Sequence, residues 1–328
     1  MNSLARKPYD EDQQEAARRF PVRLTQAVIG TIRHESDPVA LQYLPDPREL
    51  EIAPGELDDP IGDHAHSPVK GIVHRHPDRV LLKISSVCAV NCRFCFRKTM
   101  LGTPEETLDE EEITQALDYI AATPSIWEVI LTGGDPLILS PRRLAGVLDR
   151  LEEIGHVKII RIHSRIPVAD PARISPPLLK ALDRQKPLYI VVHVNHRQEL
   201  ADPAQKALRD LHKSGVALLS QSVLLKNVND TVEALEALFR ALTELRVKPY
   251  YLHHPDKVPG AGHFRVSIEE GQILMRALRA KTSGLALPTY VLDIPGGFGK
   301  IPLEDAYIER QGDFLYVTDH KGRRHLYA

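Results

Sequence analysis

The chain has 328 residues, of which 43% are hydrophobic and 26% charged, and its formal net charge is −2 at pH 7. These proportions are typical of a globular protein with one large domain or two smaller ones. The small net charge gives no reason to expect nucleic acid as a partner. The sequence has no apolar run long enough for a membrane span or a signal peptide. With no framework of paired cysteines, we expect a cytoplasmic protein with reduced thiols.

Residues 1–75 are rich in proline, aspartate and histidine, which predicts a helical, loop-rich N-terminal extension. Beyond it, β-branched runs alternate with amphipathic stretches. The expected strands are 79–87, 127–133, 157–164, 188–195, 217–225 and 248–254. The expected helices are 108–122, 141–154, 175–185, 203–214, 231–246 and 267–281. Six successive units of this kind predict an α/β fold, in which a parallel sheet covered by helices curls into a partial (β/α)6 TIM-like barrel.

We therefore divide the chain into the extension (1–75), the barrel (76–285) and a C-terminal segment (286–328). The C-terminal segment contains a glycine-rich turn, "PGGFGK", which ends at Lys300. The alternating "DFLYVTD" and the following "HKGRRH" predict a terminal hairpin.

All three cysteines lie in "CAVNCRFC", directly after the first expected strand of the barrel. An odd number of cysteines at C-x3-C-x2-C spacing excludes a closed set of disulfides. Three interpretations remain: structural thiols, a zinc site completed by a histidine, and an iron–sulfur cluster with one open iron.

Polar clusters follow the other strands as well. "TGGDP", "HSR", "HVNH" and "HHPD" come at or after the ends of strands two, three, four and six. In a parallel sheet these positions share one edge, where the active sites of barrels lie. A single cluster of this kind is commonly structural, but their agreement favours a functional site.

The segments "CRFCFRK", "LTGGDPL", "IRIHSRIPV", "HVNH", "SQSVLLKNVND", "GHFR" and "DIPGGFGKIPL" together carry a family likeness. From about residue 70 to 303 the chain resembles the lysine 2,3-aminomutase family of radical S-adenosylmethionine enzymes. The resemblance implies a [4Fe–4S] cluster, S-adenosylmethionine and pyridoxal 5′-phosphate as cofactors. It also implies an electron donor such as flavodoxin or ferredoxin. The implied reaction converts L-lysine to β-lysine by moving the amino group from Cα to Cβ.

The resemblance also implies roles for individual residues. The cluster ligands would be Cys88, Cys92 and Cys95, and Lys300 would form the Schiff base with pyridoxal phosphate. Arg79 matches a family arginine near that cofactor. Residues implied for the S-adenosylmethionine pocket are Gly133, Gly134, Asp135, Arg165, His193 and Gln221.

Three further residues are implied to bind the substrate. Arg97 would hold the α-carboxylate in a two-point contact. Asp256 in "HHPDKV" and Asp293, seven residues before Lys300, would grip the lysine ε-ammonium. Two carboxylates disfavour a neutral or acidic side chain, so lysine is the expected substrate, and arginine and ornithine remain open.

The sequence departs from the longer, catabolic members in lacking additional cysteines for a structural zinc. In this it is closer to the branch that makes β-lysine for elongation factor P, whereas Asp293 and "PGGFGK" look more like the catabolic branch. The alternatives outside this class are a non-catalytic iron–sulfur protein and a structural zinc protein. We expect no nucleic-acid or membrane partner, and the sequence leaves homo-oligomerisation open.

Overall fold

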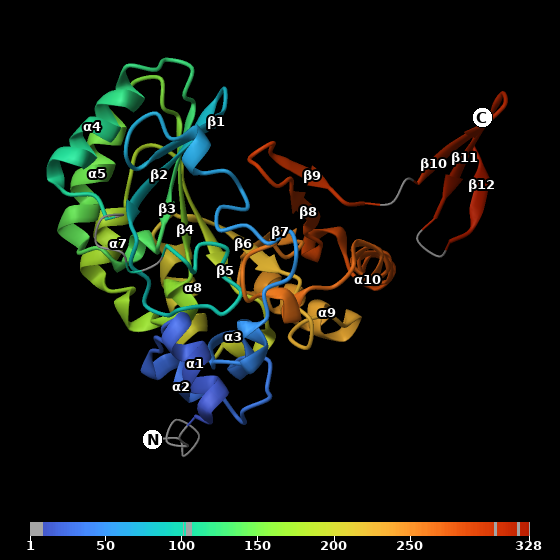
Figure 1. Ribbon diagram of the computed structural model, residues 1–328. Helices are drawn as coiled ribbons and strands as arrows, with labels where there is room; N and C mark the ends of the chain where they lie inside the picture. The colour runs from blue at the N-terminus through green and yellow to red at the C-terminus, as the bar shows by residue number, and fades with distance from the viewer. Residues whose placement is uncertain (1–8, 101, 103–106, 305–306, 320–321, 328) are drawn as a thin grey trace.

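The computed structural model describes residues 9–100, 102, 107–304, 307–319 and 322–327. Nine strands form one sheet in which each strand pairs with its neighbours in sequence, in the order β1 to β9. Strands β2 to β8 are parallel, and β1 and β9 add antiparallel edges. The sheet curls into an open half-barrel with helices on its outer face (Figure 1), which confirms the expected α/β partial barrel.

All six expected strands form. They are β2 (Arg79–Ser85), β3 (Glu128–Gly133), β4 (Ile159–Ser164), β5 (Leu188–His193), β6 (Ala217–Val223) and β7 (Lys248–His253). The expected helices correspond to α4 (Glu110–Ala121), α5 (Pro141–Glu153), α7 (Pro176–Leu182), α8 (Asp202–Lys213), α9 (Val232–Glu244) and α10 (Ile268–Lys281). Helix α4 begins with a capping box between Asp109 and Glu112. The acidic residues of its first turn also interact favourably with the helix dipole.

The direction of the side chains along each strand determines what faces the barrel interior. In β4, Ile160 and Ile162 are fully buried in the core cluster that also contains the helices' apolar residues. Because side chains alternate along a strand, Arg161 and His163 face the interior. The interior face of β4 is therefore polar, whereas the space between sheet and helices is apolar.

Three strands of the main sheet were not expected. They are β1 (Ile72–His76), β8 (Thr289–Asp293) and β9 (Lys300–Pro302). β8 pairs in parallel with β7, so the barrel has seven parallel strands rather than six. These strands are short and lie next to Pro, Gly and His residues, so their sequences give little alternation to detect.

The two ends of the chain differ in their packing. Helices α1 (Glu11–Arg19), α2 (Gln26–Thr31) and α3 (Ala40–Tyr43) lie at one end of the barrel (Figure 1). The short helix α6 (Ile166–Ala169) follows β4. The expected terminal hairpin forms from β11 (Phe314–Thr318) and β12 (Arg324–Leu326), and β10 (Ile308–Gln311) pairs with β11 to complete a separate three-stranded antiparallel sheet. No helix in the described part of the chain is both long and apolar enough to cross a membrane.

Candidate active site

The three cysteines lie in the loop that follows β2, at the carboxyl edge of the sheet. All three are free thiols. Burial raises the pKa of Cys88, and the neighbouring charges of Asp135, Cys95 and Cys92 raise it further. Burial also raises the pKa of Cys95 to about 11, with Cys92 adding to the effect. Because the charge of one thiolate raises the pKa of another, the three thiols lie close together. A bound cation would stabilise their thiolate forms.

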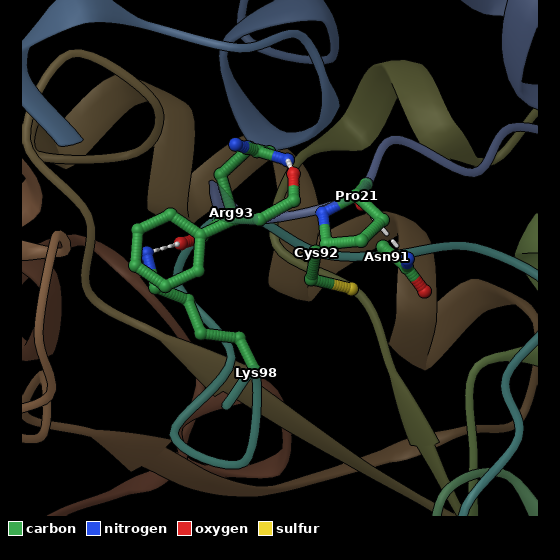
Figure 2. Close-up of a pocket in the computed structure, with 6 residues that line it drawn as sticks. Pro21, Asn91, Cys92, Arg93 and Lys98 are labelled. Carbon is green, nitrogen blue, oxygen red and sulfur yellow. Dashed lines mark hydrogen bonds between the residues drawn. The ribbon is translucent and has the colours of Figure 1, made fainter. Parts of the chain in front are cut away.

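Buried ion pairs hold the cysteine loop to the N-terminal extension. Arg93 and Lys98 both contact Glu49, with Arg93 Nε 2.8 Å and Lys98 Nζ 3.3 Å from its carboxylate oxygens. Arg93 Nη1 also donates to the Phe20 carbonyl at 2.7 Å. Figure 2 shows Arg93 and Lys98 beside Cys92 in a small pocket against Pro21. The extension therefore fixes the conformation of the loop.

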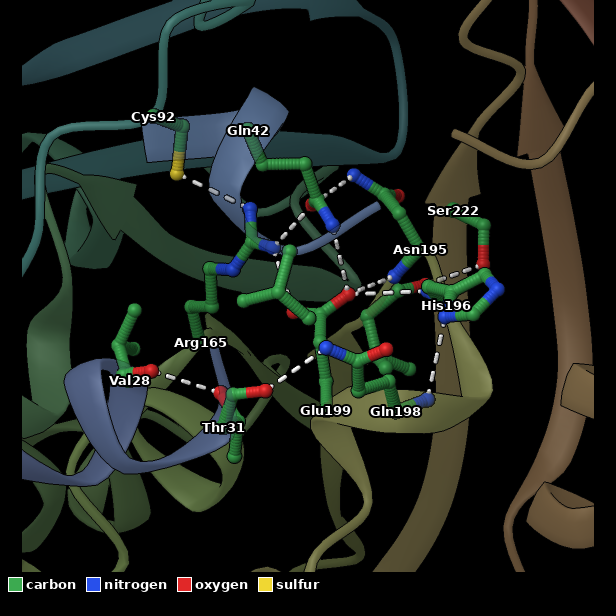
Figure 3. Close-up of polar contacts among 12 residues, drawn as sticks. Val28, Thr31, Gln42, Cys92, Arg165, Asn195, His196, Gln198, Glu199 and Ser222 are labelled. Carbon is green, nitrogen blue, oxygen red and sulfur yellow. Dashed lines mark hydrogen bonds and ion pairs between the residues drawn. The ribbon is translucent and has the colours of Figure 1, made fainter. Parts of the chain in front are cut away.

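Arg165 connects Cys92 to a second buried network. Its Nη1 donates to Cys92 Sγ at 3.0 Å, and its Nη2 donates to Gln42 Oε1 and Glu199 Oε2, both at 2.6 Å (Figure 3). Arg165 follows β4, and this residue, predicted for the S-adenosylmethionine pocket, contacts the cysteine loop. Its guanidinium binds both Cys92 and Glu199.

The glycines after β3 allow a close approach of two backbones. A Cβ added to Gly134 would lie 2.3 Å from the Val87 carbonyl oxygen, and Gly133 has a φ of +108°. The Gly134 and Asp135 amides donate to the carbonyls of Ser85 and Val87. Only glycine fits against the loop at these positions.

Asp135 is fully enclosed and caps the turn after β4. Its carboxylate accepts hydrogen bonds from Ser164 Oγ at 2.8 Å and from the Arg165 amide at 2.7 Å. Burial nevertheless raises its pKa. Asp135 thus connects the end of β3 to the end of β4. It directly follows the glycines that contact the cysteine loop.

His193 and Gln221 lie side by side at the ends of β5 and β6, where they are paired in register. The His193 ring contacts Phe94 of the cysteine loop edge-on, with 5.6 Å between ring centroids. Its Nε2 is buried and has no hydrogen-bond partner among the described residues. Both residues are therefore at the edge where the sequence places the S-adenosylmethionine pocket.

The number of thiolates fits a cluster with one open iron. A structural zinc site takes four protein ligands, whereas the chain has three cysteines. A [4Fe–4S] cluster places each thiolate on a different iron, and three cysteines leave the fourth iron for another ligand.

Lys300 lies on β9, the edge strand at the other end of the sheet from β1 and β2. It forms an ion pair with Asp293 at the end of β8. Lys300 Nζ is 2.6 Å from Asp293 Oδ1, and His253 Nδ1 is 3.4 Å from Oδ2. Burial disfavours the Asp293 carboxylate, but His253 and Lys300 outweigh it and hold its pKa below the usual range. The lysine and one of the two predicted substrate acids are therefore direct neighbours.

Asp256 is the second predicted acid, in the loop after β7. Burial, and then the charge of Asp293, raise the pKa of Asp256 to about 7. Among the described residues its carboxylate makes no hydrogen bond or ion pair, although the charges of Lys300, Arg97 and Arg75 act on it. Two carboxylates therefore lie near one another, and of the two Asp256 is the one that has no direct cationic partner among the described residues.

Arg97 is buried between the cysteine loop and the barrel. Its Nε and Nη2 donate to Asp63 Oδ2 at 3.1 and 2.8 Å, while its Nη1 is 3.4 Å from Thr132 Oγ1. Asp63 belongs to the N-terminal extension. The predicted carboxylate-binding residue is thus already held by an acid of the chain itself.

Arg79 is at the opposite end of β2 from the cysteines and forms an ion pair with Asp78 at 2.8 Å. Burial lowers the pKa of His76, and the charges of Arg79, Arg75 and Lys300 lower it further. The charges of three cations, Arg79, Arg75 and Lys300, therefore act on His76. An amine and several cations on one face form a donor set that fits pyridoxal phosphate, an aldehyde with a dianionic group.

Three buried polar residues of the site were missed from the sequence: Glu49, Asp63 and Glu199. Glu49, Asp63 and Glu199 each bind an arginine that lies far away in the sequence. The signal that could have located them is the number of arginines and lysines in the cysteine loop and after β4, since buried cations need acidic partners.

Comparison with known proteins places this site in a family. A model described as the Radical SAM superfamily matches residues 82–241, and one described as Lysine-2,3-aminomutase matches 275–317. The L-lysine 2,3-aminomutase of Clostridium subterminale is 41% identical over 288 residues, 88% of this chain and 69% of that one. The L-lysine 2,3-aminomutase of Escherichia coli (strain K12) is 39% identical over 292 residues, 88% of this chain and 85% of that one.

A glutamate enzyme and a distant structure are also similar. The glutamate 2,3-aminomutase of Clostridioides difficile (strain 630) is 35% identical over 288 residues, 88% of this chain and 68% of that one. The crystal structure of Streptococcus suis SuiB bound to precursor peptide SuiA superposes with a TM-score of 0.50 at 14% identity, over 66% of this chain and 49% of that chain. The latter similarity concerns the fold alone.

The half-barrel, the cysteine loop after β2 and the matching superfamily model together define a radical S-adenosylmethionine enzyme. The superfamily implies a [4Fe–4S] cluster and S-adenosylmethionine as cofactors. Within it, the chain belongs to the lysine 2,3-aminomutase family of isomerases, whose membership implies pyridoxal phosphate. This membership sets aside the non-catalytic and structural-zinc alternatives.

Proposed function

We propose that this enzyme converts L-lysine to β-lysine by moving the amino group from Cα to Cβ. The observation that carries the proposal is the acid pair at the end of the barrel: Asp293 binds Lys300 at 2.6 Å, and the charge of Asp293, together with burial, raises the pKa of the partly buried Asp256 to about 7. The repulsion between two partly buried acids is relieved by a cation. The ε-ammonium of lysine supplies that cation, whereas the carboxylate of glutamate would add a third negative charge.

The energy of such a contact is large enough to select the substrate. One carboxylate about 4 Å from an ammonium contributes roughly 4 kcal/mol at an effective dielectric constant of about 20, before desolvation. Lysine therefore has a strong advantage over norleucine, which has the same length and no distal charge.

The other site residues divide the remaining tasks. Cys88, Cys92 and Cys95 hold the cluster, and Lys300 holds pyridoxal phosphate, with Arg79 near it. Gly133, Gly134, Asp135, Arg165, His193 and Gln221 shape the S-adenosylmethionine pocket, and Arg97 binds the substrate carboxylate. When bound, the cluster and S-adenosylmethionine supply the radical that starts the reaction, and pyridoxal phosphate supplies the π system through which the nitrogen migrates.

We further propose that a flavodoxin or ferredoxin reduces the cluster, and that the enzyme works in the reducing cytoplasm, where free thiolates persist.

The proposal is tested by anaerobic turnover of the reduced, reconstituted enzyme with lysine, ornithine, arginine, norleucine and glutamate in parallel. Products are identified by mass spectrometry against authentic β-amino acids. We expect lysine to give the highest kcat/KM and norleucine to react poorly. Preferential turnover of glutamate, or equal turnover of lysine and norleucine, would overturn the assignment of the acids.

A further inference from the structure

Asp63 is a buried carboxylate of the N-terminal extension with cations on two sides. It is 1% exposed. Its Oδ2 accepts both hydrogen bonds from Arg97, and its Oδ1 lies 3.8 Å from Arg75 Nη2 without a hydrogen bond of its own among the described residues. Burial disfavours its ionised form, but Arg97, Lys83 and Arg75 outweigh this and hold its pKa below the usual range.

The segment around Asp63 also contacts the turn that leads to Lys300. The Gly296 amide donates to the Pro60 carbonyl at 3.0 Å. A Cβ on Gly62 would lie 2.6 Å from the Gly296 carbonyl oxygen, and a Cβ on Gly297 would lie 3.0 Å from the Ile61 carbonyl oxygen. The backbones of residues 60–62 and 296–297 are therefore in close contact, so this piece of the extension forms one wall of the site.

A separate acid holds the segment in shape. The Asp59 carboxylate accepts hydrogen bonds from the Asp63 and His64 amides, both at 2.9 Å. Asp59 thus stabilises the local turn. The Asp63 side chain takes no part in that turn and is directed to Arg97 instead.

The contacts of Arg97 show which part of its guanidinium is already used. The edge formed by Nε and Nη2 is bound to Asp63 at 3.1 and 2.8 Å. Nη1 has only long contacts, 3.4 Å to Thr132 Oγ1 and 3.5 Å to the Gly133 carbonyl oxygen. An arginine side chain loses about 2 kcal/mol of rotamer entropy when it is ordered, so a residue that orders it in advance improves binding of the next ligand.

We propose that Asp63 is a positioning residue that fixes Arg97 so that its Nη1 end is presented to the α-carboxylate of the substrate. The inference rests on the proposed role of Arg97 and extends the site to the N-terminal extension. Asp63 could have the opposite role, as an internal carboxylate that the substrate carboxylate must displace from Arg97. In that case lysine would bind more tightly once the Asp63 carboxylate is removed.

The test compares two ligands on cluster-free protein loaded with pyridoxal phosphate, so that no turnover is needed. L-Lysine and pentane-1,5-diamine share both amines, and only lysine has the carboxylate that Arg97 would bind. Their dissociation constants are measured from the absorption change of the Schiff-base cofactor on titration. In Asp63→Asn we expect lysine binding to weaken by about ten-fold or more, equivalent to about 1.4 kcal/mol, with the diamine unchanged.

Three variants serve as controls. Asp63→Glu keeps the charge and is expected to retain most of the preference for lysine. Asp59→Asn disturbs the turn without touching Arg97, so it should leave the ratio of the two dissociation constants unchanged. Arg97→Met tests the underlying role: if it retains the preference for lysine, the assignment of Arg97 itself fails.

If Arg97→Met loses the preference for lysine, the result for Asp63→Asn decides whether Asp63 positions Arg97. Weaker binding of lysine alone supports it. Equal weakening of both ligands, unchanged lysine binding, or tighter lysine binding would each overturn it. If Asp63→Asn does not fold, Asp63→Glu with an unaltered fold and a lost lysine preference would contradict it.

Discussion

Asp293 has two potential partners, because its carboxylate binds Lys300 in the protein without ligands and is also proposed to bind the substrate ammonium. The sequence places these residues seven apart but gives no reason to pair them. The structure pairs them through the antiparallel β8 and β9, in which Asp293 is directly opposite Lys300. The lysine proposed to hold the cofactor and the acid proposed to select the substrate are therefore in direct contact.

We expect Asp293→Asn to raise the apparent KM for lysine by one to two orders of magnitude, corresponding to roughly 1.4 to 2.8 kcal/mol. It should also speed the uptake of pyridoxal phosphate, because the Lys300 ammonium is no longer held by a carboxylate at 2.6 Å. Uptake is followed by absorption and by borohydride trapping. Asp256→Asn is the matched control, since Asp256 does not bond Lys300: it should raise KM without changing uptake. Identical uptake rates in both variants would contradict the pairing.

Asp256 also makes the stability of the protein without cofactors depend on pH. Its folded-state pKa of about 7 is above the usual value of 3.8. The folded state therefore binds the proton more tightly, and stability falls as pH rises from about 4 to 7, with the full cost present above that range. Three pKa units correspond to roughly 4 kcal/mol as an upper figure.

Asparagine cannot ionise, so Asp256→Asn should raise the unfolding temperature more at pH 8 than at pH 5. Thermal unfolding followed by circular dichroism at the two pH values measures the difference. An equal change at both would mean that Asp256 is not a strained carboxylate.

At the scale of the elements, the cluster loop depends on the glycine turn after β3. Gly134 packs on the backbone of Val87, and a Cβ there would be 2.3 Å from a carbonyl oxygen. We expect Gly134→Ala to displace the loop and to abolish both cluster assembly and S-adenosylmethionine binding. Trapping of pyridoxal phosphate at Lys300 should survive, because β9 is on the other side of the barrel.

Gly146→Ala is the control for that substitution. Gly146 lies in α5, and nothing is within 4 Å of the position of its Cβ. Alanine should be neutral or stabilise the helix by up to about 1 kcal/mol. A Gly134→Ala protein with a normal iron content and normal S-adenosylmethionine binding would show that the loop does not need this close contact.

Elements with strong periodicity were predictable from the sequence, and short ones were not. The six long β/α units gave alternation and amphipathicity, and each of them forms in the structure. β8 has only the run "TYVLD" between Pro288 and Pro295, and "IERQ" of β10 is entirely exposed. Such strands form because neighbouring strands pair with them. A local sequence pattern contains no information about those partners, so it does not predict the strands.

The same limit applies to the site. Cys88, Cys92, Cys95 and the clusters at strand ends follow from chain order, because a parallel sheet brings the carboxyl ends of its strands to one edge. The pairing of Asp63 with Arg97 or of Glu49 with Arg93 depends on how the extension folds back over the barrel, and no spacing rule contains that information. Residues on the strands could therefore be predicted, whereas their partners from the extension could not.

For the whole molecule, the site is assembled from all three parts of the chain. The extension supplies Glu49 and Asp63, the barrel supplies the cysteine loop and the strand ends, and the C-terminal segment supplies Asp293 and Lys300. In the proposed function, an amino acid bound between these parts contacts Arg97 at one end and the two acids at the other. The proposed arrangement suits a substrate with a carboxylate and a distal ammonium.

The most direct test of the account follows the nitrogen atom itself. The reduced, reconstituted enzyme is given L-lysine labelled with ¹³C at Cα and Cβ and with ¹⁵N at the α-amino group, and the product is examined by NMR. The account predicts β-lysine in which the ¹⁵N is coupled to the former Cβ and no longer to the former Cα. Lysine recovered with its nitrogen on Cα, under conditions in which S-adenosylmethionine is cleaved and pyridoxal phosphate is bound at Lys300, would contradict it.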